Sequence, residues 1–155
     1  MPKNESRFDL IEISLNKKLM LKMQGKIMGK RILIIDDNEN HLDVLKETLC
    51  YFNFEVKTLA SGNYLMEEVY QFKPDLILLD YILPGKDNGI VLCQQLKNNI
   101  HTHNIPVVLM SGYHLVSEQF SCCDGFLYKP FDLNILIKEL ATYLDTTIQI
   151  PFSYV

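Results

Sequence analysis

The chain has 155 residues, of which 48% are hydrophobic and 22% are charged, and its formal net charge at pH 7 is −4. This length suits one domain with a buried core, and this composition excludes a fibrous or wholly disordered chain. Every apolar run is shorter than the roughly 18–20 residues that span a bilayer, and the first residues lack the apolar stretch of a secretory signal. We therefore expect a cytoplasmic protein without a membrane span.

The charges are divided unevenly along the chain. Residues 1–31 carry eight basic and three acidic side chains, whereas residues 32–155 carry seven basic and sixteen acidic ones. An acidic body without a basic stripe argues against direct nucleic-acid binding by the domain. The basic segment could dock on the acidic body, on a partner or on anionic lipid, or it could be a plain extension.

Short apolar runs alternate with amphipathic stretches from residue 31 onward. Buried strands are predicted at Arg31–Ile35, Phe54–Leu59, Leu76–Leu79, Pro106–Met110 and Gly125–Tyr128. Apolar residues that recur at spacings of three and four predict helices at Glu39–Asn53, Tyr64–Phe72, Ile90–Leu96 and Leu133–Leu144.

Strands that are apolar on both faces and alternate with helices indicate a parallel sheet that is covered on both sides. Five such units predict an α/β, flavodoxin-like (βα)5 fold, which is a doubly wound five-stranded parallel sheet. We expect a basic extension over residues 1–29, the domain over 30–145 and a tail over 146–155. In such sheets a ligand binds beyond the carboxyl ends of the strands.

Polar side chains follow four of the predicted strands. Asp36 and Asp37 come after the first strand and Asp80 after the third. Ser111 comes after the fourth strand and Lys129 after the fifth. Each signal alone is weak, because paired acids after a strand often cap a helix. Together they place three carboxylates, a hydroxyl and an ammonium group at one edge of the sheet.

Three close carboxylates repel one another, and a divalent cation relieves that repulsion. Carboxylate, carbonyl and water oxygens suit Mg²⁺. A carboxylate can also attack phosphorus and form an aspartyl phosphate. Asp80 is the best nucleophile, because it projects alone from the centre of the sheet, while Asp36 and Asp37 would hold the metal. Lys129 would pair with the phosphoryl group, and the Ser111 hydroxyl would donate a hydrogen bond to it.

Four segments together resemble the response-regulator receiver domain of two-component signalling, in its single-domain, chemotaxis-regulator-like form. They are ILIIDDN (32–38), DLILLDYILPGKDNG (75–89), IPVVLMSG (105–112) and GFLYKPF (125–131). The resemblance implies that a histidine kinase or a histidine phosphotransfer protein supplies the phosphoryl group to Asp80. It also implies Mg²⁺ held by Asp37, Asp80 and the backbone carbonyl of Ile82, with Asp36 acting mostly through water.

The resemblance further implies a switch. Phosphorylation would draw the Ser111 hydroxyl inward, and Phe126 would rotate to follow it. The peptide bond between Lys129 and Pro130 is expected to be cis. The chain has fewer residues between Ser111 and Lys129 than the family usually has, so we expect the fourth helix, at about residues 114–120, to be short.

The sequence therefore predicts a phospho-accepting response regulator that catalyses only its own phosphorylation and dephosphorylation. Few residues follow the last helix, so we expect a separate downstream protein effector; a homodimer stays open. Ile82 and Tyr113, two residues after Asp80 and Ser111, are bulky and predict slow loss of the phosphoryl group to water. The alternative is a phosphate-independent receiver-like interaction module. A phosphatase of the haloacid-dehalogenase type would need a second Asp where this chain has Ile82.

Other residues of types that can bind metals or phosphates are better explained without a ligand. Four cysteines follow no CxxC or paired-ligand spacing and predict reduced thiols: Cys50, Cys93, Cys122 and Cys123. His101 and His103 lie in a polar stretch and are expected to face solvent. The segment GKIMGK (25–30) has neither the spacing nor the final hydroxyl residue of a phosphate-binding loop.

Overall fold

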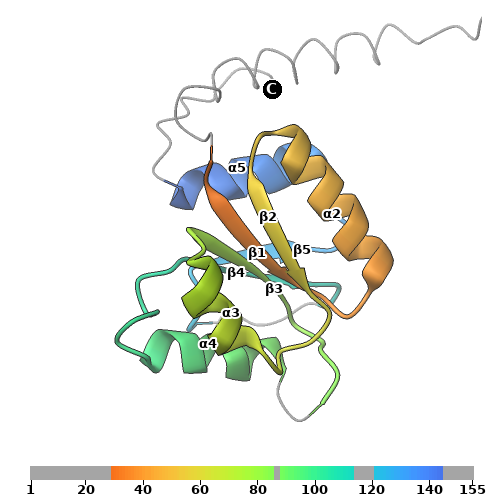
Figure 1. Ribbon diagram of the computed structural model, residues 1–155. Helices are drawn as coiled ribbons and strands as arrows, with labels where there is room; N and C mark the ends of the chain where they lie inside the picture. Colours follow the sequence, from red (N-terminus) through yellow and green to blue (C-terminus); the bar gives the residue numbers. More distant parts are fainter. Residues whose placement is uncertain (1–28, 86–87, 114–120, 145–155) are drawn as a thin grey trace, which may run out of the picture.

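In the part of the chain that the structure describes, the apolar runs form one parallel sheet between two pairs of helices (Figure 1). The computed structural model describes residues 29–85, 88–113 and 121–144. In these ranges the strands are β1 (Arg31–Ile35), β2 (Glu55–Leu59), β3 (Leu76–Asp80), β4 (Val107–Ser111) and β5 (Gly125–Tyr128). The helices are α2 (Glu39–Tyr51), α3 (Leu65–Phe72), α4 (Gly89–Asn98) and α5 (Leu133–Tyr143).

The strand order β2-β1-β3-β4-β5, with every neighbouring pair parallel, confirms the predicted doubly wound fold. The order reverses direction between β1 and β3, and in such folds this switch point is where ligands bind. The expected helix at 114–120, the tail at 146–155 and all but the last residue of the 1–29 extension lie outside the described residues.

Most element boundaries shift by one or two residues from the predicted ranges, and two of these shifts have a clear local cause. Helix α2 ends at Tyr51 because Asn53 adopts a left-handed backbone conformation, with φ of 62°. Strand β4 begins at Val107, since Pro106 has no amide hydrogen to donate. The carbonyl of Pro106 still accepts a hydrogen bond from the amide of Ile77 at 2.9 Å, so it continues the pairing with β3.

Each face of the sheet buries its own apolar cluster. Alternate residues of β1 point to opposite faces, as the pleat requires. Ile32 and Ile34 pack in a cluster with side chains of α2 and α5, whereas Leu33 and Ile35 pack with side chains of α3 and α4. Strand β3 lies at the centre, and its first four residues have no exposed surface. The sheet is therefore a rigid, dry support for the residues at its edge.

Helix α4 begins very close to the end of β3. The amide of Gly89 donates to the carbonyl of Tyr81 at 2.9 Å, and the Asn88 side chain caps the helix by accepting from the Val91 amide at 3.1 Å. A Cβ atom at Gly89 would lie 2.3 Å from the backbone carbonyl oxygen of Asp80. Only glycine permits this approach, which fixes the start of α4 against Asp80.

None of the helices in the described ranges is both long enough and apolar enough to cross a bilayer.

Gly89→Ala should therefore destabilise the fold by about 1–3 kcal/mol, because the new methyl group meets backbone that cannot rotate away. Urea unfolding measures the difference. Gly112→Ala is the control: among the described residues nothing lies within 4 Å of its Cβ position, and its effect should stay within about 0.5 kcal/mol. Equal unfolding midpoints for the two variants would contradict this account of the β3–α4 contact.

Candidate functional site

The predicted polar residues meet at the carboxyl edge of the sheet. Asp36 follows β1, Asp80 ends β3, Ser111 ends β4 and Lys129 follows β5. Each of Asp36, Asp37 and Asp80 offers a carboxylate oxygen, and these oxygens lie within 4.8 Å of one another. Three acids from two neighbouring strands thus share one small volume.

Lys129 joins two of these acids. Its Nζ lies 2.6 Å from Oδ2 of Asp36 and 3.2 Å from Oδ2 of Asp80. The backbone amide of Lys129 donates to the carbonyl of Ser111 at 2.8 Å, which continues the β4–β5 pairing beyond the strand. The peptide bond from Lys129 to Pro130 is cis. Lys129 is therefore held at the acidic edge by the hydrogen bond of its backbone amide to Ser111 and by the ion pairs of its ammonium group with Asp36 and Asp80.

Asp36 is completely buried, and each of its carboxylate oxygens has a partner. Oδ1 accepts a hydrogen bond from the amide of Asn38 at 2.9 Å, while Oδ2 faces Lys129 and lies 3.4 Å from Nδ1 of His41. The side chain of Asn38, not that of either aspartate, caps helix α2. Helix capping therefore does not explain why two acids follow β1.

The pKa of the Asp80 carboxyl group lies above its ordinary value. Its burial raises the pKa, the Lys129 ammonium opposes that rise, and the charge of Asp36 adds to it. The backbone amide of Ile82 also donates a hydrogen bond that favours the ionised form. Asp80 is buried, and its side chain keeps 11% of its surface accessible.

The two predicted switch residues lie on neighbouring strands. Ser111 is buried, and its Oγ accepts a hydrogen bond from the Tyr113 amide at 2.9 Å. Phe126 is partly buried against the cluster on the α3–α4 face, and its ring meets that of Tyr128 edge-on, with centroids 4.5 Å apart. Ser111 ends β4, whereas Phe126 lies in β5 in register with Leu109, two residues before Ser111. The coupled movement of the two residues stays a prediction.

The donor set of this edge suits a hard divalent cation. Three carboxylates face one ammonium group, and the excess negative charge attracts a cation that prefers oxygen ligands. Asp37 is exposed and can bind an ion that keeps part of its water shell. The arrangement can therefore hold Mg²⁺ next to Asp80.

Comparisons with known proteins agree with this arrangement. Residues 32–141 match the family model described as the response regulator receiver domain. The chain belongs to this family.

Among curated proteins, the receiver is 32% identical over 125 residues to the DNA-binding dual master transcriptional regulator RpaA of Synechocystis sp., covering 78% of this chain and 52% of RpaA. It is 35% identical over 109 residues to the response regulator PleD of Caulobacter vibrioides, covering 68% of this chain and 24% of PleD. The chain thus spans about half or a quarter of the length of these relatives.

Solved structures show the same fold. A putative response regulator from Chloroflexus aurantiacus aligns with a TM-score of 0.69 and 26% identity, over 75% of this chain and 98% of that one. TrrA of Thermotoga maritima, solved in complex with Mg²⁺-BeF, aligns with a TM-score of 0.67 and 25% identity, over 74% and 98%.

The structure also contains a cluster that the sequence pattern did not predict. Cys93 of α4 lies against Cys122 and Cys123, which precede β5. Residues 93 and 122 are far apart in the chain, so no ligand spacing links them. All four cysteines are free thiols in this structure, and three of them are neighbours in space, which their spacing in the sequence did not indicate.

Asp80→Asn should stabilise the metal-free receiver at neutral pH. The folded pKa of Asp80 lies above its unfolded value, so its protonated form contributes stability below the unfolded pKa. The wild type loses this stability as the pH rises through the folded pKa of Asp80. The asparagine side chain of the variant does not ionise, so the variant keeps its stability. Urea unfolding in a chelator should therefore give the variant the higher midpoint at pH 7, and the gap should close in acid.

Saturating Mg²⁺ should reverse this order, since a ligand at a hundred times its Kd stabilises the wild type by about 2.7 kcal/mol. Asp43→Asn removes an exposed carboxylate from α2 and serves as the control, with a small effect in both buffers. If Asp80→Asn had the same unfolding midpoints as the control, burial of the ionised Asp80 carboxylate would not lower the stability of the fold.

Proposed function

We propose that this receiver is a phospho-accepting response regulator. Asp80 takes a phosphoryl group from a histidine kinase or a histidine phosphotransfer protein, and Mg²⁺ is the cofactor. The observation that carries the proposal is the Asp80 carboxylate itself. It ends the central strand, is nearly buried, has the Lys129 ammonium at 3.2 Å and lies beside two further acids.

In the proposed reaction a carboxylate oxygen of Asp80 attacks the phosphorus of a phosphohistidine. The new oxygen–phosphorus bond forms as the phosphorus–nitrogen bond breaks, and the imidazole leaves with its electron pair. Asp37, Asp80 and the Ile82 carbonyl would hold the metal, with Asp36 acting through water. The bound ion supplies positive charge that neutralises the phosphoryl oxygens.

Lys129 has a second role in this reaction. Its ammonium group already lies between Asp36 and Asp80, so a small shift lets it pair with a phosphoryl oxygen on Asp80. Asp36 keeps Lys129 oriented while this happens. Because the ammonium is in place before the donor arrives, little reorganisation is needed as charge develops.

The switch would follow from the charge of the product. A phosphoryl group adds about two negative charges at neutral pH. The Ser111 hydroxyl now pairs with the Tyr113 amide at 2.9 Å, and it would exchange this contact for a phosphoryl oxygen. Phe126 would then move toward the vacated space. The receiver shifts its population only by the difference in free energy between these two sets of contacts.

The partners follow from the same chemistry. The phosphoryl donor is a histidine kinase or a histidine phosphotransfer protein that reaches this receiver in the cytoplasm, and the output passes to a downstream protein that binds the switched face. Catalysis by the receiver is limited to its own phosphorylation and dephosphorylation. The whole-protein activities of RpaA and PleD belong to longer chains, so they are not transferred to this one.

Incubation with acetyl phosphate and Mg²⁺ should add one phosphoryl group to the wild type, as read by intact mass. Asp80→Asn should show no gain, because the amide is a poor nucleophile, and a chelator should abolish the gain in the wild type. Asp43→Asn is the matched control and should be modified normally. Absence of modification in the wild type would favour a phosphate-independent interaction module, and continuous phosphate release from many esters would favour a phosphatase.

Ile82 and Tyr113 should slow hydrolysis of the phosphorylated form. The two side chains are 47% and 60% exposed, and each lies two residues after a site residue, where it can obstruct attacking water. The double variant with alanine at both positions should lose its phosphoryl group about tenfold faster, which corresponds to about 1.4 kcal/mol in the barrier. A time course of intact mass gives the rate. Equal rates, or decay of the wild type within seconds, would refute the proposed obstruction.

A further inference from the structure

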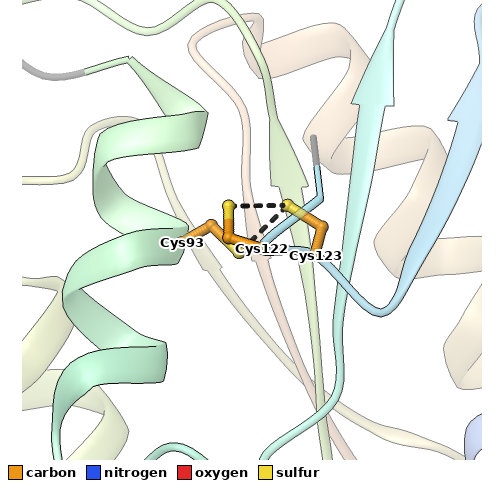
Figure 2. Close-up of side chains that lie close together, drawn as sticks. All are labelled: Cys93, Cys122 and Cys123. Carbon is orange, nitrogen blue, oxygen red and sulfur yellow. Dashed lines mark hydrogen bonds between the residues drawn. The ribbon is translucent and has the colours of Figure 1, made fainter. Parts of the chain in front are cut away.

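Three thiols meet on the α3–α4 side of the sheet, away from the acidic edge. Figure 2 shows the side chain of Cys93 reaching from α4 toward Cys122 and Cys123 in the segment before β5. The Sγ atoms of Cys93 and Cys123 are 2.9 Å apart, and those of Cys122 and Cys123 are 3.8 Å apart. All three lie within 4.8 Å of one another. Cys93 is buried and the other two are partly buried.

We propose that Cys93, Cys122 and Cys123 bind one Zn²⁺ ion through their thiolates, with water as a fourth ligand. Thiolates select soft cations, and zinc sites with three protein ligands keep an open fourth position. Zn–S bonds of about 2.3 Å in tetrahedral geometry separate the sulfur atoms by about 3.8 Å. The Cys122–Cys123 pair has this separation, and the Cys93–Cys123 pair needs only to widen.

The charge balance favours a divalent cation over a monovalent one. Three thiolates with Zn²⁺ leave one net negative charge, whereas a monovalent ion would leave two in a partly buried place. Lys97 lies four residues after Cys93 on the same face of α4, close enough for its ammonium to favour the Cys93 thiolate. Asp124 pairs with that ammonium at 2.5 Å and so holds Lys97 beside the cluster. The hydrogen bond from Cys123 is the larger effect that lowers the pKa of Cys93, whereas the charge of Asp124 opposes its thiolate form.

Two other states of the cluster compete with metal binding. The first is a set of neutral thiols, because burial raises the pKa of Cys122, and the hydrogen bond to Cys93 followed by burial raises that of Cys123. The second is a disulfide between Cys93 and Cys123, whose sulfur atoms are neighbours. A site for Zn²⁺ differs from both, because it requires all three sulfur atoms at once.

This site is independent of the proposed phosphorylation at Asp80. Its ligands come from α4 and from the segment before β5, and none of them belongs to the acidic edge. A bound ion would tie these two elements together, and the partly buried Phe126 packs in the same cluster of side chains. Zinc would therefore stiffen the part of the receiver that carries one proposed switch residue.

The test is a titration of reduced, metal-free receiver with Co²⁺ under anaerobic conditions in excess Mg²⁺. Cobalt bound by thiolates gives a sulfur-to-metal charge-transfer band, and cobalt at a carboxylate site does not, so the acidic edge is silent. We expect one equivalent of Co²⁺ to give the band and Zn²⁺ to displace it. Its absence in reduced wild-type protein would overturn the proposal.

Single variants locate the ligands. Cys122→Ser and Cys123→Ser replace partly exposed thiols, and each should weaken the apparent affinity for Zn²⁺ by about tenfold or more, measured against a chromophoric chelator. Cys50→Ser, on the exposed face of α2, is the matched control and should bind like the wild type. Unchanged affinity in both test variants would overturn the proposal. So would a separate aerobic experiment with Zn²⁺ present, if intact mass showed that dissolved oxygen had removed two hydrogens to form a Cys93–Cys123 disulfide and that no zinc was bound.

Discussion

The ammonium group of Lys129 holds the functional edge of this receiver together. It contacts Asp36 and Asp80 at 2.6 and 3.2 Å, and these three residues follow or end strands that are separate in the chain. Two carboxylates so close would repel by an energy on the order of several kcal/mol without an opposite charge. Because β3 and β4 separate β1 from β5, the contact exists only when the whole sheet order is correct. Folding and assembly of the site are therefore the same event.

The packing of side chains behind this edge explains how the Asp80 carboxylate is kept in place although its burial is unfavourable. The four residues of β3 before Asp80 have no exposed surface, and Gly89 brings the start of α4 against the backbone of Asp80. The carboxylate consequently has little freedom to move toward water, and its pKa rises. A cation or a phosphoryl group bound at this position meets a carboxylate that is already fixed. Binding of a cation relieves the repulsion and the unfavourable burial of the carboxylates, and this relief adds to the affinity for the cation.

Much of the fold and of this site could be predicted from the sequence because both depend on local patterns. Apolar runs identified the strands, and the parallel sheet then required Asp36, Asp80 and Lys129 to share an edge. The helix cap could not be assigned in this way, since Asn38 and the two acids before it all have suitable side chains. The contact of Cys93 with Cys122 was also beyond prediction, because α4 meets the segment before β5 only through tertiary packing. Spacing rules detect ligands that are close in sequence, and this cluster is formed by the sheet.

The two clusters differ in ligand chemistry, and this difference keeps their proposed ions apart. Oxygen ligands at the acidic edge suit Mg²⁺, which stays partly hydrated, whereas thiolates suit a softer ion. Helix α4 contacts both: Gly89 abuts the backbone of Asp80, and Cys93 lies one turn further along. An ion at the thiols would restrain the helix whose start fixes the phosphoryl acceptor. Its effect would be transmitted by α4 as a rigid element that contacts both clusters.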